Sequence, residues 1–161
     1  MPTPTTIRVS DLGPGAGYAL WGFRASAIGH VQCPVLIRGF DDVFGDHSRP
    51  ALGGIQLLAR ELGMSGGRRI TIACPGCGNA TADEISLVAT LSAAQRGDAD
   101  LCDAHLTWLM CGKRQETARS AAFSIASVFR AVGLDIAKPN VELVCHAPSK
   151  AFVSYHDTGH A

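Results

Sequence analysis

The feature that most constrains the fold of this chain is a helical repeat of apolar residues between positions 118 and 132. At about 100° of rotation per residue, one face of this stretch is apolar. It is made of Ala118, Ala121, Ala122, Ile125, Val128, Phe129 and Val132. Gly133 follows, and glycine is the residue that most often ends a helix. A helix with one apolar face is stable when that face packs against other elements, so the chain is expected to form a bundle.

Similar patterns predict five further helices, over residues 18–30, 34–45, 48–63, 81–96 and 98–110. The start of the fourth is the best defined, because Thr81 and Glu84 have the spacing of a capping box. The links at 96–98 and 112–115 are short, and we expect them to make the last three helices antiparallel neighbours. The predicted fold class is therefore mainly α, a compact bundle of about six helices.

Two segments have the character of extended chain rather than helix. Residues 68–73 alternate and include β-branched side chains, which is typical of a strand. Residues 140–145 are either a last strand or an extended tail. If residues 70–73 and 141–145 pair, the fold is α+β with a small sheet; if they do not, it is all-α.

The patterns also divide the chain into three parts. Residues 1–16 are rich in proline, glycine and threonine and are expected to be loosely ordered. Residues 17–148 form the predicted helical domain. Residues 149–161 lack apolar periodicity and are expected to be a flexible tail. A chain of about 150 residues can bury roughly 68–70% of its unfolded surface, so it needs no metal or disulfide to fold.

The charge of the chain argues against nucleic acid as a partner and favours association of the chain with itself. Its 14 basic and 14 acidic side chains cancel, which argues against nucleic acid and gives no sign of an anionic membrane. Charged residues are only 17% of the chain, against about 25% in average proteins, so copies repel one another weakly. No secretory signal or membrane-spanning run is found. We therefore expect a cytoplasmic protein whose cysteines are reduced thiols or ligands.

Four residues have the chemistry and spacing of a metal site. Cys74 and Cys77 form a Cys-x-x-Cys turn, in which we expect glycine to permit the tight reversal of the backbone. Cys102 and His105 lie three residues apart in the predicted helix 98–110, on its apolar face together with Trp108. Together the four would make a tetrahedral Cys3His set, which is the ligand set of a structural zinc site.

Two other interpretations of these residues remain open. Cysteine is among the most buried residue types, so the four could be core thiols and a hydrogen-bonded histidine without metal. The Cys74–Cys77 turn could instead be a reactive thiol pair, although Thr81 is the helix cap and neither thiol would lie in the first helical turn. We expect no cofactor, with one structural zinc as the alternative.

No set of residues in the sequence is arranged for catalysis. The glycines of residues 13–17 and 63–67 match nucleotide-loop and nucleophile-elbow letters, but neither has the strand and helix that those motifs need. We interpret the chain as a non-enzymatic module that binds itself or another protein, with Phe123 as an exposed aromatic for that surface. The alternatives are a zinc-stapled regulatory module, and a thiol-based enzyme or small-ligand binder that uses the Cys74–Cys77 turn.

Overall fold

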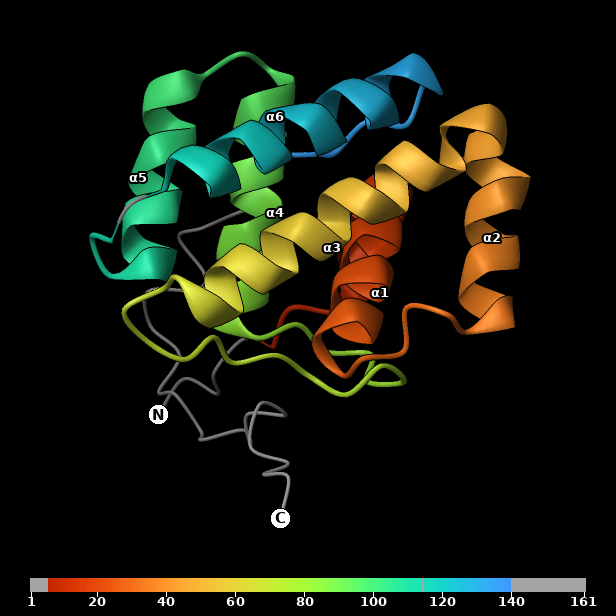
Figure 1. Cartoon of the computed structure of the whole chain (residues 1–161), viewed down its shortest axis with the longest axis horizontal. Helices are drawn as coiled ribbons and strands as arrows, with labels where there is room; N and C mark the ends of the chain where they lie inside the picture. The colour runs from red at the N-terminus through yellow and green to blue at the C-terminus, as the bar shows by residue number, and fades with distance from the viewer. Residues whose placement is uncertain (1–5, 114, 140–161) are drawn as a thin grey trace.

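The computed structural model describes residues 6–113 and 115–139, and within them the protein is a bundle of α-helices (Figure 1). The helices are α1 (Gly13–Ala27), α2 (Pro34–Phe44), α3 (Ser48–Met64), α4 (Ala82–Gln95), α5 (Ala99–Met110) and α6 (Glu116–Ala131), with 3-10 helices at Val9–Leu12 and Gly45–His47. The predicted mainly α fold is confirmed. The described ranges contain no strand, and their one isolated β-bridge joins Arg8 to Asn79. The segments expected at 141–145 and 149–161 lie outside the described residues.

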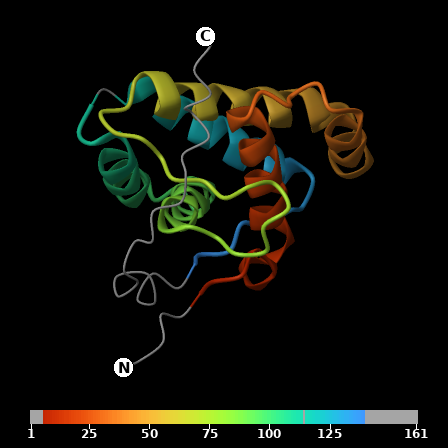
Figure 2. The same ribbon diagram turned by 90° about the horizontal axis from the view of Figure 1, so that it is seen from below.

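The helices are arranged in two crossing sets, which Figures 1 and 2 show from two directions. Helices α3 and α6 lie side by side, while α4 and α5 form a neighbouring pair that runs across them. Helix α1 packs against α3, and α2 lies at the edge of the bundle. The antiparallel pairing predicted for α4 and α5 is confirmed. The one predicted for α5 and α6 is wrong, because the apolar face of α6 packs on α3 and α4 instead.

Aromatic rings join the edge of the bundle to its centre. The rings of Phe40 and Phe44 in α2 stack with 5.1 Å between centroids, and Phe44 meets Phe129 of α6 at 4.8 Å. All three side chains are buried. Tyr18 of α1 also meets Phe40 and Phe44, with centroids 5.8 and 6.0 Å apart. Ring pairs between helices add to the free energy of burying their area, so these contacts help to hold α2 on the bundle.

Helix α1 begins at Gly13, five residues before the predicted start. Leu12 and Ala16 are buried, so this segment belongs to the core rather than to a loose end. The cause is a close packing contact: a Cβ atom on Gly15 would overlap the backbone carbonyl of Asp135, which lies against the first turn of α1. A glycine-rich segment that resembles a loop in sequence is here a helix packed tightly against another backbone.

Residues 68–73 are irregular and contain no strand, so the strand predicted there is wrong. Their alternation correctly indicates burial, since Ile70 and Ile72 both pack in the core. Their backbone amides are bound by side chains instead of a second strand. The amide of Thr71 donates to Asp83 Oδ2 at 2.6 Å, and that of Ala73 donates to Glu84 Oε1 at 3.2 Å. The carboxylates at the start of α4 thus replace a neighbouring strand.

Candidate functional site

Among the described residues, several buried polar and charged side chains lie around the long connection between α3 and α4, residues 65–81. Figure 2 shows this connection from below. The connection is irregular, yet two buried carboxylates in the first turn of α4 bind it. Asp83 holds the half nearer α3, and Glu84 holds the half nearer α4. The predicted capping box is confirmed, because Thr81 and Glu84 each accept a hydrogen bond from the other's backbone amide.

Glu84 also forms a buried ion pair with Arg24 of α1. Arg24 Nε lies 2.6 Å from Oε1 and Nη2 lies 2.9 Å from Oε2, with side chains 4% and 0% exposed. Burial lowers the pKa of Arg24, but the hydrogen bonds and charge of Glu84, followed by Cys77 and Cys74, raise it by more. The guanidinium is therefore charged, and its fork matches the carboxylate in the bidentate geometry that is strongest for such pairs.

The rest of the Arg24 guanidinium binds the backbone of the Cys-x-x-Cys turn. Nη1 donates to the carbonyls of Cys77 and Cys74, at 2.7 and 3.3 Å, and Nη2 donates to that of Asn79 at 3.0 Å. The turn is closed by a hydrogen bond of 2.9 Å from the amide of Cys77 to the carbonyl of Cys74. A buried ion pair thus fixes the backbone of a surface turn from beneath.

The turn presents two neighbouring thiols. Cys74 is exposed and Cys77 is half-buried. In a four-residue turn of this kind the first and last Cα atoms lie within about 7 Å, and proline suits its second position. The expectation that glycine permits the reversal is wrong, because neither Gly76 nor Gly78, which closes the turn, has a positive φ, and a Cβ at either position would meet no atom within 4 Å.

The other two residues of the predicted zinc set lie in different surroundings. Cys102 is fully buried in the core, and burial, with smaller effects of Asp103 and other charges, raises its pKa to about 11. His105 is half-buried, with Nδ1 3.2 Å from Ser86 Oγ of α4. Among residues 6–113 and 115–139, no three His, Cys, Asp or Glu side chains gather so that they could hold one metal ion. The Cys3His zinc site stays a prediction, which metal analysis of its variants tests.

The other half of the connection is built around Arg68 and Trp108. The Arg68 guanidinium binds Asp83 with both oxygens, at 2.8 and 3.1 Å, and donates to the carbonyl of Trp108 at 3.3 Å. Its carbon lies 4.4 Å from the centre of the Trp108 ring. Trp108 is nonetheless 52% exposed, so its predicted place on the apolar face of the helix is wrong. The Arg68 guanidinium thus lies over the indole ring, and about half of the Trp108 side chain remains exposed.

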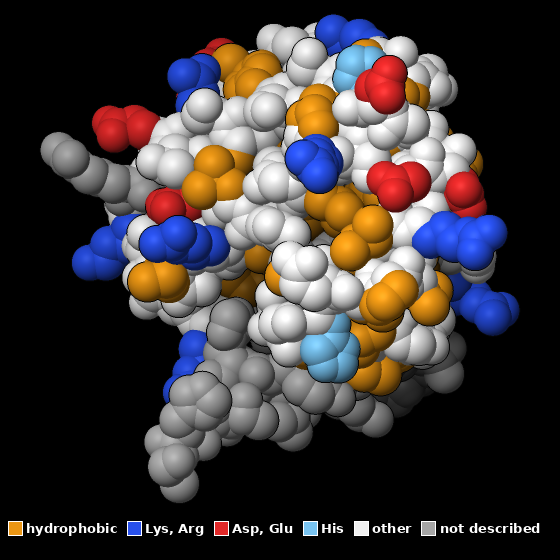
Figure 3. Space-filling view, turned by 45° about the vertical axis from the view of Figure 1, so that its right-hand side comes forward, with side chains coloured by type: hydrophobic (Ala, Val, Ile, Leu, Met, Phe, Trp, Pro, Cys, Tyr) orange, Lys and Arg blue, Asp and Glu red, His pale blue; other side chains and the backbone are white. Residues whose placement is uncertain are grey.

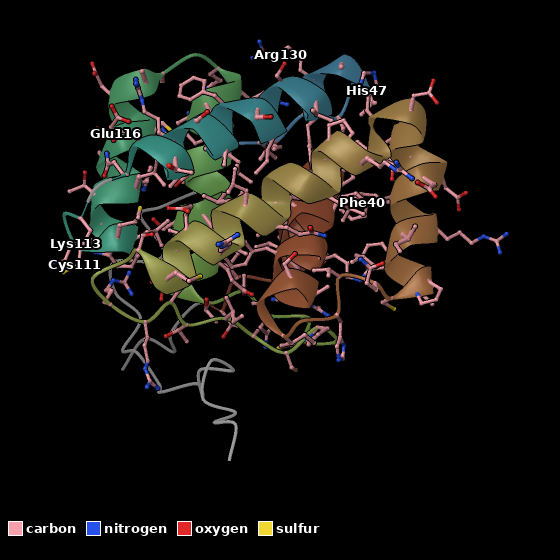
Figure 4. All side chains as sticks on the ribbon, viewed as in Figure 1. Phe40, His47, Cys111, Lys113, Glu116 and Arg130 are labelled. Atoms are coloured by element: carbon pink, nitrogen blue, oxygen red, sulfur yellow. The ribbon has the colours of Figure 1, made fainter. Side chains whose placement is uncertain are left out.

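The end of α3 adds an exposed apolar side chain and an open recess. Met64, at the end of α3, is 74% exposed. Next to it an open recess of about 360 Å³ is lined by Gly63, Gly66, Gly67, Arg68, Arg69 and Ile70. Gly67 lies against the end of α5, with its amide 2.9 Å from the carbonyl of Met110. Figure 4 shows Cys111 and Lys113 at the same end of the molecule.

Phe123, which we expected to be an exposed aromatic, is half-buried and packs against the core. The guanidinium of Arg119 lies 5.6 Å from the centre of its ring. Phe123 is therefore unavailable as a large apolar contact, and Trp108 is the aromatic side chain that this part of the structure exposes. The helical wheel misplaced both residues because it shows the faces of one helix and not which neighbours cover them.

Sequence reasoning missed Arg24 and the pair Arg68–Asp83. A signal for Arg24 was present, since an arginine four residues after Leu20 on an apolar helix face must find a buried partner. The signal for Glu84 was hidden by its role in the capping box, which already accounted for a glutamate at that position.

Comparison with known proteins finds no family model, curated protein or solved structure that matches this chain. None of the helices in the described ranges is long and apolar enough to cross a membrane.

Proposed function

We propose that this small helical protein is a non-enzymatic module that associates with a second copy of itself. The proposed contact is the Trp108 surface, defined as Met64, Arg68, Trp108 and the recess beside them. The observation that carries the proposal is the half-exposed Trp108 ring lying on an arginine that Asp83 holds in place.

The residue types on this surface support the proposal. Tryptophan, arginine and methionine are enriched at protein interfaces, where a few such residues supply most of the binding energy. The Arg68 side chain is already ordered by Asp83, so it loses little rotamer freedom when a partner binds. In a symmetric dimer, the Trp108 surface of one copy would face the Trp108 surface of the other.

The charge of the whole chain supports a second copy as the partner. The 14 acidic and 14 basic residues cancel, so two copies do not repel each other through net charge. On the face shown in Figure 3, acidic and basic side chains are interspersed with hydrophobic patches rather than separated by sign.

Sedimentation equilibrium over a range of protein concentrations tests the proposal. The wild-type chain is expected to form dimers, and Trp108→Ala to weaken them by about 30-fold or more, because truncation of a central tryptophan costs roughly 2 kcal/mol. Val35→Ser is the control, since Val35 is an exposed apolar residue of α2 outside the Trp108 surface. A wild-type chain that stays monomeric, or a Trp108→Ala variant as dimeric as the wild type, contradicts the proposal.

A further inference from the structure

We propose that the Cys74–Cys77 turn is a binding site for one Cu(I) ion, held by the two cysteine sulfurs of a single chain. The site is separate from the Trp108 surface and does not depend on self-association.

The geometry of the turn favours binding of one ion by both cysteines. The hydrogen bond from the amide of Cys77 to the carbonyl of Cys74 keeps the two residues at the ends of one tight turn. Cys74 is exposed and Cys77 half-buried, so an ion can reach the pair from solvent. No side chain projects from Gly76 between them, and the space where its Cβ would lie is open.

The backbone of the turn is also held in place by buried charged side chains. Arg24 donates to the carbonyls of both cysteines, and Glu84 holds Arg24 through two hydrogen bonds. Both charged side chains are buried, and burying an ion pair is costly unless the geometry is good and the remaining donors are satisfied. The Arg24–Glu84 ion pair thereby orders the backbone at Cys74 and Cys77. Preorganisation of the ligands by such outer partners is typical of metal sites.

The number and the softness of the ligands favour Cu(I) over other ions. Thiolates select soft ions such as Cu(I) and also bind zinc. Zinc in structural sites takes four ligands, whereas Cu(I) is stable with two thiolates in a near-linear arrangement. Within residues 6–113 and 115–139 no third His, Cys, Asp or Glu joins the pair in a group that could hold a metal. The described donor set therefore fits Cu(I) better than zinc.

Binding involves no change of oxidation state. Each thiol loses its proton to solvent, two copper–sulfur bonds form, and copper enters and stays as Cu(I). The resulting centre carries one negative charge. The Arg24 guanidinium, which donates to the carbonyls of Cys77 and Cys74, places a positive charge next to it.

Transfer of copper from the coloured Cu(I)–bicinchoninate complex to the reduced protein, without oxygen, tests the proposal. The wild-type chain is expected to take one Cu(I) per chain. Cys74→Ser and Cys77→Ser are each expected to weaken binding at least 100-fold, since either change removes one of two ligands. Glu84→Gln, which acts through Arg24, is expected to weaken it by roughly 10- to 100-fold. Circular dichroism confirms that each variant is folded.

Matched controls separate the turn from the other cysteines. Cys111→Ser removes another exposed thiol, and Gly76→Ala alters the turn where there is room for a methyl group. Both are expected to keep one Cu(I) per chain. Trp108→Ala is also expected to keep it, so a failure of the proposed self-association and a failure of the copper site give different results.

Four results would overturn the copper site. The reduced wild-type chain could take no Cu(I), or both turn variants could bind it like the wild type. A stoichiometry of one copper per two chains would show an ion bridging two copies. Loss of binding in Cys102→Ala or His105→Ala, with the fold intact, would instead identify the Cys3His set.

Discussion

At the scale of single residues, Arg24 joins the core of the protein to the Cys-x-x-Cys turn at its surface. It makes five hydrogen bonds, two to Glu84 and three to carbonyls of residues 74–79. Arginine suits this position because its planar fork can bind a carboxylate and several carbonyls at once, which a lysine cannot do. One buried residue of α1 thereby fixes a turn about 50 residues further along the chain.

Removal of this guanidinium is expected to be strongly destabilising. In Arg24→Met the Glu84 carboxylate is left buried without its cation, and loss of one partner of a buried pair typically costs about 3–5 kcal/mol. Urea unfolding followed by circular dichroism measures the change. Arg68→Met is the matched control, because the Arg68 side chain is 30% exposed and water can replace part of its interaction with Asp83. An Arg24→Met variant that loses no more stability than Arg68→Met would contradict this view of the pair.

At the scale of the elements, the segment after α6 is bound as closely as a helix. Ile136 is buried, and its amide donates to Gln95 Oε1 at 2.7 Å, while Gln95 Nε2 donates to the carbonyl of Leu134 at 3.1 Å. The side chain of Gln95, the last residue of α4, thus binds both sides of Asp135. The same segment presses the carbonyl of Asp135 against Gly15 of α1.

This contact predicts opposite effects for two neighbouring glycines. Gly15→Ala is expected to lower the free energy of unfolding by roughly 1–3 kcal/mol, because the new methyl group overlaps the carbonyl of Asp135. Gly17→Ala is expected to be neutral or to raise it by up to about 1 kcal/mol, since its Cβ has no atom within 4 Å and alanine favours the helix. Thermal and urea unfolding of the two variants measure the difference. Equal effects would mean that residues 134–136 do not pack on α1 as described.

At the scale of the whole molecule, acid is expected to weaken the bundle through His105. Burial, followed by the positive charge of Lys138, lowers the pKa of His105 below its ordinary value of 6.5. The unfolded chain then binds a proton more readily than the folded one as the pH falls through 6.5. Stability from this source is complete above pH 6.5 and is lost as the pH falls towards the lower pKa of the folded state.

Urea unfolding midpoints measured above and below pH 6.5 test this expectation. The wild-type midpoint should fall on acidification, and the fall should be smaller in His105→Gln, whose amide can still meet Ser86 but cannot gain a proton. Lys138→Gln should reduce the fall in part, because it removes the second cause of the shift. A fall of the same size in all three proteins would assign the acid sensitivity to other groups.

The sequence by itself determined the class of the fold and most helix boundaries. The apolar period of α6, the prolines at the starts of α2 and α3, and the capping box of α4 act within one helix, so they can be read without knowing what packs on it. The Cys-x-x-Cys turn can also be recognised from the sequence, because its four residues are consecutive. Local interactions are encoded by neighbours along the chain.

Only the tertiary structure decided which of these features meet. The ion pair of Arg24 with Glu84 joins residues 60 positions apart in the sequence. Trp108 is exposed because no neighbouring helix in the described ranges covers it. The need for glycine at position 15 follows from its contact with the carbonyl of Asp135. The placement of α6 on α3 rather than along α5 has the same origin. A periodic pattern shows that a face must be covered, but the partner that covers it is chosen by the packing of the whole bundle, where several helices offer similar apolar surfaces.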